Sequence, residues 1–354
     1  MTPLGDLLIR RIAQTGPITL ADYMAECLMH PAHGYYSTRD PFGVAGDFTT
    51  APEISQMFGE LLGLALAQSW LDQGAPSRFV LAELGPGRGT LMADVLRATR
   101  TVPGFHAAAQ VTLVETSAHL RGRQRLMLGD HPVQWLDSVH DLPDAPLFLL
   151  GNEFFDALPI RQFLRAPQGW CETMVGVAQG ALCFGRSDPT TIAALQSRLT
   201  DTMPGDIVEI CPTAASIMTA IGGQIATFGG LAILTDYGGW TSRGDTFQAL
   251  RGHKFADPLA DPGHADLTAH VDFAALAAAA AATTARTAYV TQSALLTSLG
   301  IDARAAKLGH HLTGAALLSH QRATHRLTAP EEMGELFKAF AVFSPLSPVP
   351  PGFS

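Results

Sequence analysis

The sequence predicts an α/β fold built on a doubly wound, mostly parallel sheet, and three observations support this prediction. Apolar runs of strand length alternate with helical segments between residues 78 and 343. The first apolar run, residues 78–84, leads directly into a glycine-rich turn and then into a helical segment at residues 90–100. The next apolar run ends in an acidic residue, Glu115. This succession is typical of open parallel sheets that bind a nucleotide-like ligand.

The composition is that of a large, acidic globular protein. The chain has 354 residues, of which 47% are hydrophobic and 16% are charged, and its net charge is −9. This length allows one large domain with appendages or two domains. The negative charge and the lack of a basic cluster argue against nucleic acid as a partner.

The cysteines and the first residues indicate a reducing compartment. The four cysteines show no C-x-x-C spacing, so we expect reduced thiols and no metal site. The first residues lack the basic and apolar segments of a secretory signal, and the longest apolar run, residues 273–282, is about half a membrane span. We therefore expect a soluble, cytoplasmic chain without membrane insertion. The sequence leaves its oligomeric state open.

The elements of the first half follow from helical and strand periodicity. Residues 4–30 predict two helices separated by Pro17, and turn-rich loops then precede a helix that begins after Glu53. Beyond that helix, strands alternate with helices. We predict strands at residues 78–84, 111–115, 133–135 and 147–150, and helices at residues 90–100 and 117–128.

The pattern changes after residue 160. Residues 160–186 alternate in strand fashion between turns, which predicts a small antiparallel insertion. The polar, turn-rich residues 243–270 predict a lid or substrate loop. Further predicted elements are helices near residues 190–200, 213–228, 272–283, 302–309 and 313–326, and strands at residues 231–235, 287–291 and 337–343.

The glycine-rich turn is the first functional signal. Gly85, Gly87 and Gly89 form a G-x-G-x-G pattern after Glu83. This pattern is shorter than the G-x-G-x-x-G that cradles a pyrophosphate, and a carboxylate at the tip of the next strand, Glu115, can accept both hydroxyls of a ribose. An adenosine-type cofactor without a pyrophosphate, S-adenosyl-L-methionine, suits both features. For the glycines alone, a tight turn without a ligand is the alternative.

The second signal lies at the carboxyl end of the fourth predicted strand, where open sheets bind ligands. It reads Asn152-Glu153-Phe154-Phe155-Asp156. Two carboxylates and two aromatic faces suit a bound cation and its apolar stem. The alternative is that Glu153 caps a helix while the phenylalanines join the core.

Two further signals are weaker. Thr50, Pro52 and Glu53 follow a glycine-rich loop, and the plain alternative is that they begin a helix. His270 lies between two acidic residues, and the plain alternative is a structural histidine. The other histidines show no metal-ligand spacing with acids, and no G-x-S-x-G or Cys/His pair suggests a hydrolase.

The order of the strands narrows the fold class. Five β/α units, a sixth strand and a late seventh strand fit the Rossmann-like class I methyltransferases, whose last strand inserts antiparallel. A nicotinamide-binding Rossmann domain has six parallel strands instead. We therefore predict a seven-stranded, mostly parallel sheet in residues 71–354, with an inserted antiparallel subdomain at about 160–228 and a second insertion at about 240–272. Residues 1–70 would form an N-terminal helical region with cofactor-covering loops.

Four blocks, at residues 46–53, 83–90, 152–159 and 266–273, resemble the signatures of the MidA-like family of S-adenosylmethionine-dependent methyltransferases. This family is related to the mitochondrial complex I assembly factor that methylates an arginine. The resemblance covers nearly the whole chain and implies symmetric dimethylation of an arginine in a subunit of the respiratory NADH:quinone oxidoreductase (complex I). It also implies cofactor contacts by Thr50, Pro52, Glu53 and Glu83. Arg88 departs from the pattern, and the lack of a mitochondrial presequence suggests a bacterial cytoplasmic member.

A mechanism follows from this resemblance. A guanidinium is effectively always protonated and is a poor nucleophile, so carboxylates must hold it and localise its charge. Glu153 and Asp156 are the candidates, with Asn152 orienting them and His270 accepting the proton after transfer. Two alternatives remain: a complex I assembly chaperone that binds the cofactor only for structure, and a nicotinamide-dependent oxidoreductase.

Overall fold

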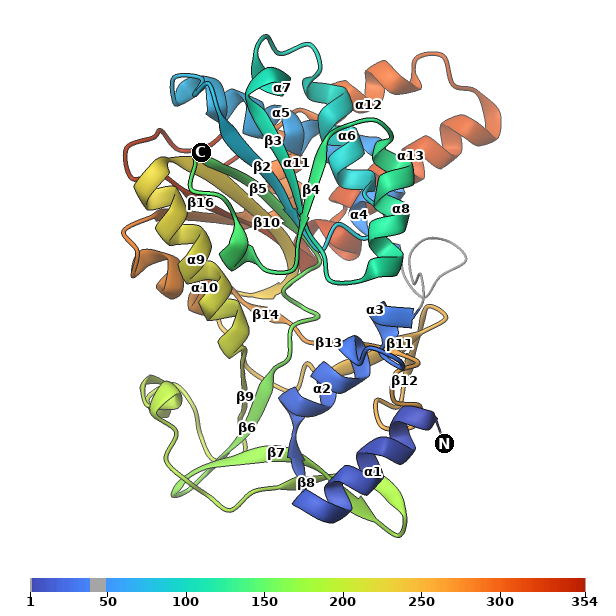
Figure 1. Cartoon of the computed structure of the whole chain (residues 1–354), viewed down its shortest axis with the longest axis vertical. Helices are drawn as coiled ribbons and strands as arrows, with labels where there is room; N and C mark the ends of the chain where they lie inside the picture. The colour runs from blue at the N-terminus through green and yellow to red at the C-terminus, as the bar shows by residue number, and fades with distance from the viewer. Residues whose placement is uncertain (1, 39–48, 354) are drawn as a thin grey trace.

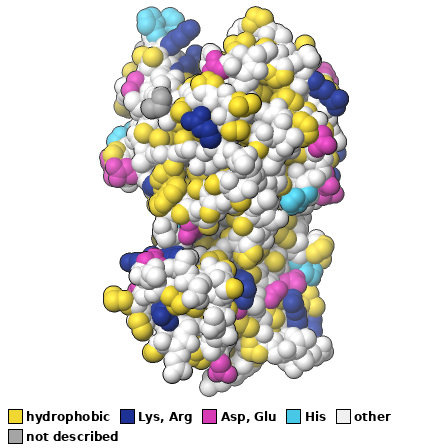
Figure 2. All heavy atoms as spheres, turned by 90° about the vertical axis from the view of Figure 1, so that its left-hand side faces the viewer, with side chains coloured by type: hydrophobic (Ala, Val, Ile, Leu, Met, Phe, Trp, Pro, Cys, Tyr) yellow, Lys and Arg dark blue, Asp and Glu magenta, His cyan; other side chains and the backbone are white. Residues whose placement is uncertain are grey.

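The computed structural model describes residues 2–38 and 49–353. An α/β body contains the main sheet, and a smaller part below it holds the first two helices and an antiparallel sheet (Figure 1). The space-filling view narrows between these two parts (Figure 2). On the face shown there, Lys and Arg side chains are scattered rather than gathered into one basic patch.

The main sheet has the strand order β15-β16-β10-β5-β2-β3-β4. From β10 to β4 all neighbours are parallel, whereas β16 is antiparallel to both β10 and β15. The two-residue strand β14 pairs with β10, so the sheet has eight strands and not the predicted seven. The strands are β2 (Phe79–Leu84), β3 (Ala109–Val114), β4 (Val133–Leu136), β5 (Leu147–Asn152), β10 (Gly230–Gly239), β14 (Val271–Asp272), β15 (Arg286–Thr291) and β16 (Phe337–Phe343).

Helices cover both faces of this sheet, which explains why its central strands are almost wholly apolar. Side chains of β2 alternate between the two faces. Phe79 and Leu81 pack with α5 (Gln56–Asp72) and α6 (Thr90–Thr99), while Val80 and Ala82 pack with α9 (Pro212–Phe228) and α10 (Phe273–Ala281). The remaining helices of this body are α4 (Ala51–Ile54), α7 (Phe105–Ala108), α8 (Ala118–Leu128), α11 (Gln292–Ser298), α12 (Ile301–Gly309) and α13 (Gly314–Thr328).

The smaller part contains a five-stranded antiparallel sheet with the order β1-β7-β6-β9, to which β8 adds through β7. Two amphipathic helices and a short third one lie against it, with Tyr23 and Leu28 among their buried side chains. The strands are β1 (Ile18–Thr19), β6 (Arg161–Ala166), β7 (Gly169–Ala178), β8 (Ala181–Arg186) and β9 (Ile207–Ile210), and the helices are α1 (Pro3–Thr15), α2 (Leu20–Met29) and α3 (Tyr35–Thr38).

Helix α11 (Gln292–Ser298) was not predicted, and two segments of the insertions also differ from the sequence prediction. The helix predicted near residues 190–200 is absent there; two 3₁₀ turns (Ala193–Leu195 and Ser197–Leu199) and the unpredicted strand β9 follow β8. The predicted lid loop instead forms a three-stranded antiparallel sheet of β11 (Gln248–Arg251), β12 (Lys254–Ala256) and β13 (Asp266–Thr268). Its Ala249 and Leu267 pack into the same core as α1 and α2. These strands were not predicted because three or four residues are too few to show the alternation of apolar and polar side chains.

The arrangement places the functional signals at one edge. The strand order reverses between β2 and β5, because the chain continues from β2 to β3 on one side and later returns to β5 on the other. Ligands bind at such a switch point, beyond the carboxyl ends of the strands. Within the described ranges, no helix is both long and apolar enough to span a bilayer.

Candidate active site

A cavity of about 270 Å³ lies at this switch point. Its walls come from the turn after β2, the end of β3, the loop after β5, the segment around α4, and α2 with α3. It brings together nine of the twelve residues proposed from the sequence. These are Thr50, Pro52, Glu53, Glu83, Gly85, Gly87, Glu115, Asn152 and Glu153.

The glycine turn adopts a backbone that favours glycine at three positions. Gly85, Gly87 and Gly89 have φ angles of 55°, 51° and 87°. A Cβ on Gly85 would lie 2.8 Å from Cδ2 of Phe154, so this glycine allows the loop after β5 to approach the turn. Gly89 is the N-cap residue of α6 and is not part of the cavity wall.

Two acidic side chains line the cavity near the turn. Glu83 is 3% exposed, and its Oε2 has no hydrogen-bond partner among the described residues. Burial, with Glu115 and Asp94 nearby, raises the pKa of Glu83 to about 8. Glu115 is oriented by the amide of Ser117, which donates to Oε1 at 2.8 Å, and by Gln124, whose Nε2 donates to Oε2 at 3.3 Å.

The segment around α4 contacts both strand ends. The hydroxyl of Thr90 donates to Oε1 of Glu53 at 2.5 Å, and Nη1 of Arg88 lies 3.6 Å from Oε2 of Glu53. Thr50 is the N-cap residue of α4 and Glu53 is the acid of its first turn, so the plain alternative that this segment begins a helix is confirmed, although the Thr50 side chain makes no cap hydrogen bond. The earlier part of this sequence block, residues 46–48, lies outside the described residues.

Glu153 is held in the cavity wall by two donors. Asn152 Nδ2 donates to Glu153 Oε1 at 2.9 Å, and the amide of Ala51 donates to the same oxygen at 3.2 Å. Asn152 is itself positioned by Thr235, whose hydroxyl donates to Oδ1 at 2.7 Å. No helix follows Glu153 in the chain, but Ala51 is the first residue of α4, so Glu153 caps that helix, and Phe155 is buried in the core as the alternative expects. Burial and the neighbouring Asp156 raise the pKa of Glu153 to about 8.

Asp156 lies behind the cavity wall and not in it. Its side chain is 5% exposed, Oδ1 has no hydrogen-bond partner in the described chain, and the hydroxyl of Tyr237 bonds the carboxylate. Burial raises the pKa of Asp156 to about 6. Asp236 lies beside it and accepts from the amides of Phe155 and Asp156 at 2.9 and 3.2 Å.

His270 is not part of this cavity, which corrects its pairing with Glu153. It lines a second cavity of about 270 Å³ together with Phe155, Glu209 and Asp272, and its ring meets the ring of Tyr237 edge to face at 5.5 Å. Burial and the charge of Lys338 lower the pKa of His270. Asp272 caps α10 by accepting from the amide of Ala275, so it serves the helix.

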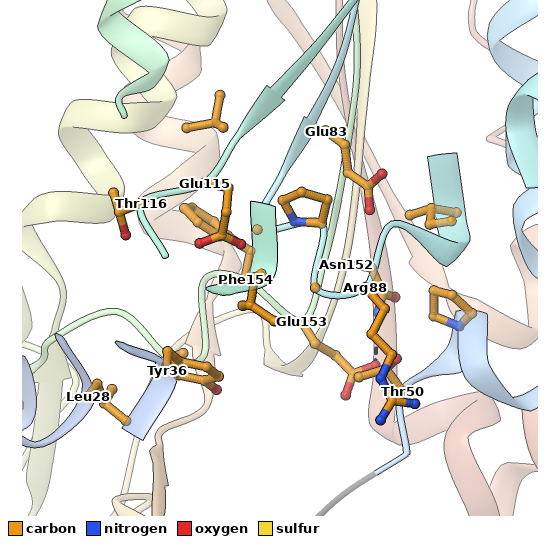
Figure 3. Close-up of a pocket in the computed structure, with 18 of the residues that line it drawn as sticks. Leu28, Tyr36, Thr50, Glu83, Arg88, Glu115, Thr116, Asn152, Glu153 and Phe154 are labelled. Atoms are coloured by element: carbon orange, nitrogen blue, oxygen red, sulfur yellow. Dashed lines mark hydrogen bonds between the residues drawn. The ribbon is translucent and has the colours of Figure 1, made fainter. Parts of the chain in front are cut away.

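Sequence reasoning missed several wall residues. Arg88 was noted only as a departure from a pattern, yet it points into the site (Figure 3). Tyr36 is not among the predicted site residues, but it lines the cavity, and its hydroxyl donates to Oδ1 of Asp266 at 2.8 Å, which joins α3 to β13. No signal in the sequence links residues 230 positions apart. Across the residues that the structure describes, no group of three or more His, Cys, Asp or Glu side chains could hold a metal ion.

Figure 3 shows how these side chains are distributed. Glu115 and Thr116 lie at one side of the cavity, and Arg88 and Thr50 lie at the other. Glu153, on the loop after β5, extends toward the side of Arg88 and Thr50. One cavity thus contains the carboxylate of Glu115 at a strand end, the glycine turn, the guanidinium of Arg88 and several further acidic side chains.

Comparison with known proteins shows which family has a sequence and a fold similar to those of this chain. Residues 61–291 match the family described as S-adenosyl-L-methionine-dependent methyltransferase. The mitochondrial protein arginine methyltransferase NDUFAF7 of Homo sapiens is 37% identical over 97% of this chain and 83% of its own length, and the Drosophila melanogaster homolog is 34% identical over 96% and 84%. The crystal structure of a Burkholderia thailandensis protein bound to S-adenosyl-homocysteine superposes with a TM-score of 0.86, at 30% identity over 99% and 94% of the two chains.

These relatives correct one expectation. The predicted bacterial cytoplasmic location is wrong by this comparison, because the curated relatives are mitochondrial proteins of animals. They also remove the nicotinamide-dependent alternative, since the matching family uses S-adenosyl-L-methionine. The family model matches residues 61–291, and the relatives are more than 30% identical over nearly the whole chain. This chain therefore belongs to the MidA-like family of S-adenosyl-L-methionine-dependent methyltransferases.

Proposed function

We propose that this chain is a protein arginine methyltransferase, and that it dimethylates symmetrically an arginine in a subunit of respiratory complex I. The arginine is supported by the relatives of this chain, which are named protein arginine methyltransferases. The resemblance of the four sequence blocks suggests the complex I subunit and the symmetric product. A non-catalytic assembly chaperone that binds the cofactor for structure is the second candidate.

The cavity fits S-adenosylmethionine. Glu115 presents a carboxylate that two donors hold at the tip of β3, the place where a ribose is bound in open α/β sheets. The buried Oε2 of Glu83, which lacks a partner in the described chain, suits a donor from a ligand. We propose that Gly85, Gly87, Gly89, Glu83, Glu115, Thr50, Pro52 and Glu53 form the cofactor site.

We also propose that two regions of the chain have different roles. Residues 71–354 would hold the cofactor and carry out the transfer, while residues 1–70 would cover the site. Leu28, Tyr36 and Thr50, all from the first 70 residues, line the cavity. The sheet at residues 248–268 would support this cover, because its Ala249 and Leu267 pack into the same core as α2.

The observation that supports arginine most is the anchored carboxylate of Glu153. Two donors fix its Oε1, and a carboxylate in this position can bind a guanidinium through two parallel hydrogen bonds. When bound, S-adenosylmethionine supplies a methyl group on a positively charged sulfur. Glu153 would localise the guanidinium charge on the nitrogens that do not react, which frees the lone pair of the one that does. Asp156, which lies behind the cavity wall, would act through its charge on Glu153.

The proton released by the transfer needs an acceptor. His270 lines another cavity, so it does not serve this role. Glu153 is better suited, because its carboxylate is anchored in the wall of the cavity in which the guanidinium would be bound. Asn152 would orient Glu153 through the bond to Oε1.

The test is a methylation assay on cell extract from a strain that lacks this gene. The protein and tritiated S-adenosylmethionine are added, and labelled proteins are hydrolysed for amino-acid analysis. We expect symmetric dimethylarginine in a complex I subunit. Label in another amino acid would contradict the arginine assignment, and a complete lack of label together with client binding would favour the chaperone.

A further inference from the structure

Glu153 has a backbone conformation that few residues other than glycine adopt. Its φ angle is 50°, in the left-handed region. Strand β10, which lies beside the end of β5, holds this turn: the carbonyl of Thr235 accepts from the amide of Glu153 at 2.9 Å. The next residue of β10, Asp236, accepts from the amides of Phe155 and Asp156. Such a conformation persists only where its surroundings fix it, so β10 sets the direction in which the Glu153 side chain leaves the loop.

The same strand orients the Glu153 carboxylate through Asn152. Oε1 of Glu153 accepts from the amide of Ala51 at 3.2 Å, and because a backbone N–H can only donate, Oε1 is an acceptor. The side chain of Asn152 must therefore present Nδ2 to Oε1, at 2.9 Å, and turn Oδ1 the other way. There the hydroxyl of Thr235 donates to Oδ1 at 2.7 Å. Since Thr235 is 1% exposed, water does not compete for this bond.

The other oxygen of Glu153 is left for a ligand. Among the described residues no hydrogen bond or ion pair reaches Oε2, and the side chain lies in the cavity wall and extends toward the side of Arg88 (Figure 3). The charged groups around it are Asp156 on the same loop, Asp236 on β10, Asp266 on β13, Glu53 on α4 and Arg88 in the glycine turn. All of these but Arg88 are acids, so the surroundings of Oε2 favour a cationic ligand.

We propose that Thr235 is a positioning residue for methyl transfer: by fixing the amide of Asn152, it makes Oε1 of Glu153 an acceptor of hydrogen bonds and leaves Oε2 to bind the guanidinium and take its proton. This role presupposes the proposed function and assigns it to one oxygen. In the transfer, the nitrogen lone pair forms the N–C bond as the C–S bond breaks, the electron pair of the C–S bond stays on the sulfur, and the N–H proton passes to Oε2. Without the hydroxyl of Thr235, Oδ1 of Asn152 loses its donor and can turn toward Oε1, which favours a protonated Glu153.

The first test follows the ionisation of Glu153 without any protein substrate. Glutamate labelled with ¹³C at Cδ reports it by NMR, and the signal that is missing from Glu153→Gln identifies the residue. Thr235→Val keeps the shape of the side chain but lacks the donor, and it should raise the midpoint of this titration by about one pH unit. Thr235→Ser keeps the hydroxyl and should hold the midpoint within about 0.3 of the parental pH. Thr112→Val on β3, whose buried hydroxyl bonds the carbonyl of Gln110, is the matched control and should not move the midpoint.

The second test is the pH dependence of kcat/KM in the methylation assay. The rise with pH that Glu153 produces should move to higher pH by the same amount in Thr235→Val and return in Thr235→Ser. A general loss of stability would lower the rate at every pH alike and would not move this midpoint. If Thr235→Val has the parental titration and the parental pH profile, the proposal is wrong.

A second variant decides if Thr235→Val fails to fold. Asn152→Ala removes the next group in the chain of hydrogen bonds and must also raise the midpoint of the Glu153 titration. An unchanged midpoint in that variant overturns the proposal. A shifted midpoint in a protein that labels no arginine would refute the proposed function and support the orientation of Glu153 by Thr235.

Discussion

The amide of Ala51 donates a hydrogen bond of 3.2 Å to Oε1 of Glu153, across 102 positions of the sequence. This bond joins the segment that precedes α5 to the loop after β5, and both contribute to the same cavity wall. A second donor, Nδ2 of Asn152, fixes the same oxygen. Two sequence blocks with no evident relation thus orient a single carboxylate.

Gly85→Ala should impair cofactor binding through Phe154. The new Cβ would lie 2.8 Å from the phenylalanine ring in a backbone with φ of 55°, so the loop after β5 must move. We expect an affinity loss of at least about tenfold for S-adenosylhomocysteine, measured by calorimetry, and a lower melting temperature. Gly122→Ala in α8 meets no atom within 4 Å and serves as the control. Unchanged affinity in Gly85→Ala would show that the turn tolerates the shift.

Glu115→Ala should weaken the cofactor by about 1–3 kcal/mol, the range for a hydrogen bond to a charged group. The carboxylate is already oriented by Ser117 and Gln124, so no reorganisation offsets its loss. Calorimetry with S-adenosylhomocysteine measures the effect, and exposed Glu331→Gln is the control. An unchanged dissociation constant would mean that Glu115 serves only the local backbone.

Methyl transfer should depend on pH through Glu153. Its pKa near 8 means that the free enzyme carries a neutral Glu153 below that pH, and only the carboxylate can bind a guanidinium. We expect kcat/KM to rise about tenfold per pH unit up to roughly pH 8 and then to level off. The bound cation lowers this pKa, so kcat should level off at lower pH. A flat kcat/KM between about pH 6 and 9 would exclude the assignment.

Asp236→Ala should destabilise the loop that carries Glu153. Asp236 accepts hydrogen bonds from the amides of Phe155, Asp156 and Tyr237, and its side chain is 1% exposed. The three amides would lose their partner, which we expect to cost on the order of 2–4 kcal/mol in the free energy of unfolding. Denaturant titration measures the change. A loss below about 0.5 kcal/mol would show that water replaces the carboxylate.

Glu83 makes stability depend on pH in the opposite sense to an ordinary ion-paired acid. Its pKa is raised to about 8, so the folded state holds a proton that the unfolded state releases near pH 4.5. The stabilisation is complete below pH 4.5 and is lost as the pH rises through about 8. Glu83→Gln should therefore gain stability relative to the parent at pH 9, but not at pH 5. Parallel stability curves for the two proteins would contradict this.

Periodicity and residue spacing correctly predicted the strand β2, the glycine turn that follows it and the acid at the end of β3. The strand before Gly85, the turn and Glu115 are contiguous or lie one strand apart, so periodicity and spacing indicated their place. Strand β9 has four residues and the sheet at residues 248–268 has strands of three or four, which is too short for alternation to show.

For the site as well, the sequence predicted the groups at the ends of strands but not the contacts between distant segments. The two signals at the ends of β2 and β5 meet because neighbouring parallel strands end together. The bond from Tyr36 to Asp266 and the separation of His270 from Glu153 arise from packing between distant segments, which no local pattern contains. The roles of Glu153, Asp156 and Asn152 in catalysis stay predictions.

The most direct test is Glu153→Gln in the methylation assay. The amide keeps the shape of the side chain but can neither bind a cation through charge nor accept the proton. We predict an S-adenosylhomocysteine affinity within about twofold of the parent and a methylarginine yield reduced by about 10²- to 10³-fold, comparable to the loss of a preorganised electrostatic group. Glu331→Gln should match the parent in both measurements. A Glu153→Gln protein that methylates arginine at the parental rate would contradict the account.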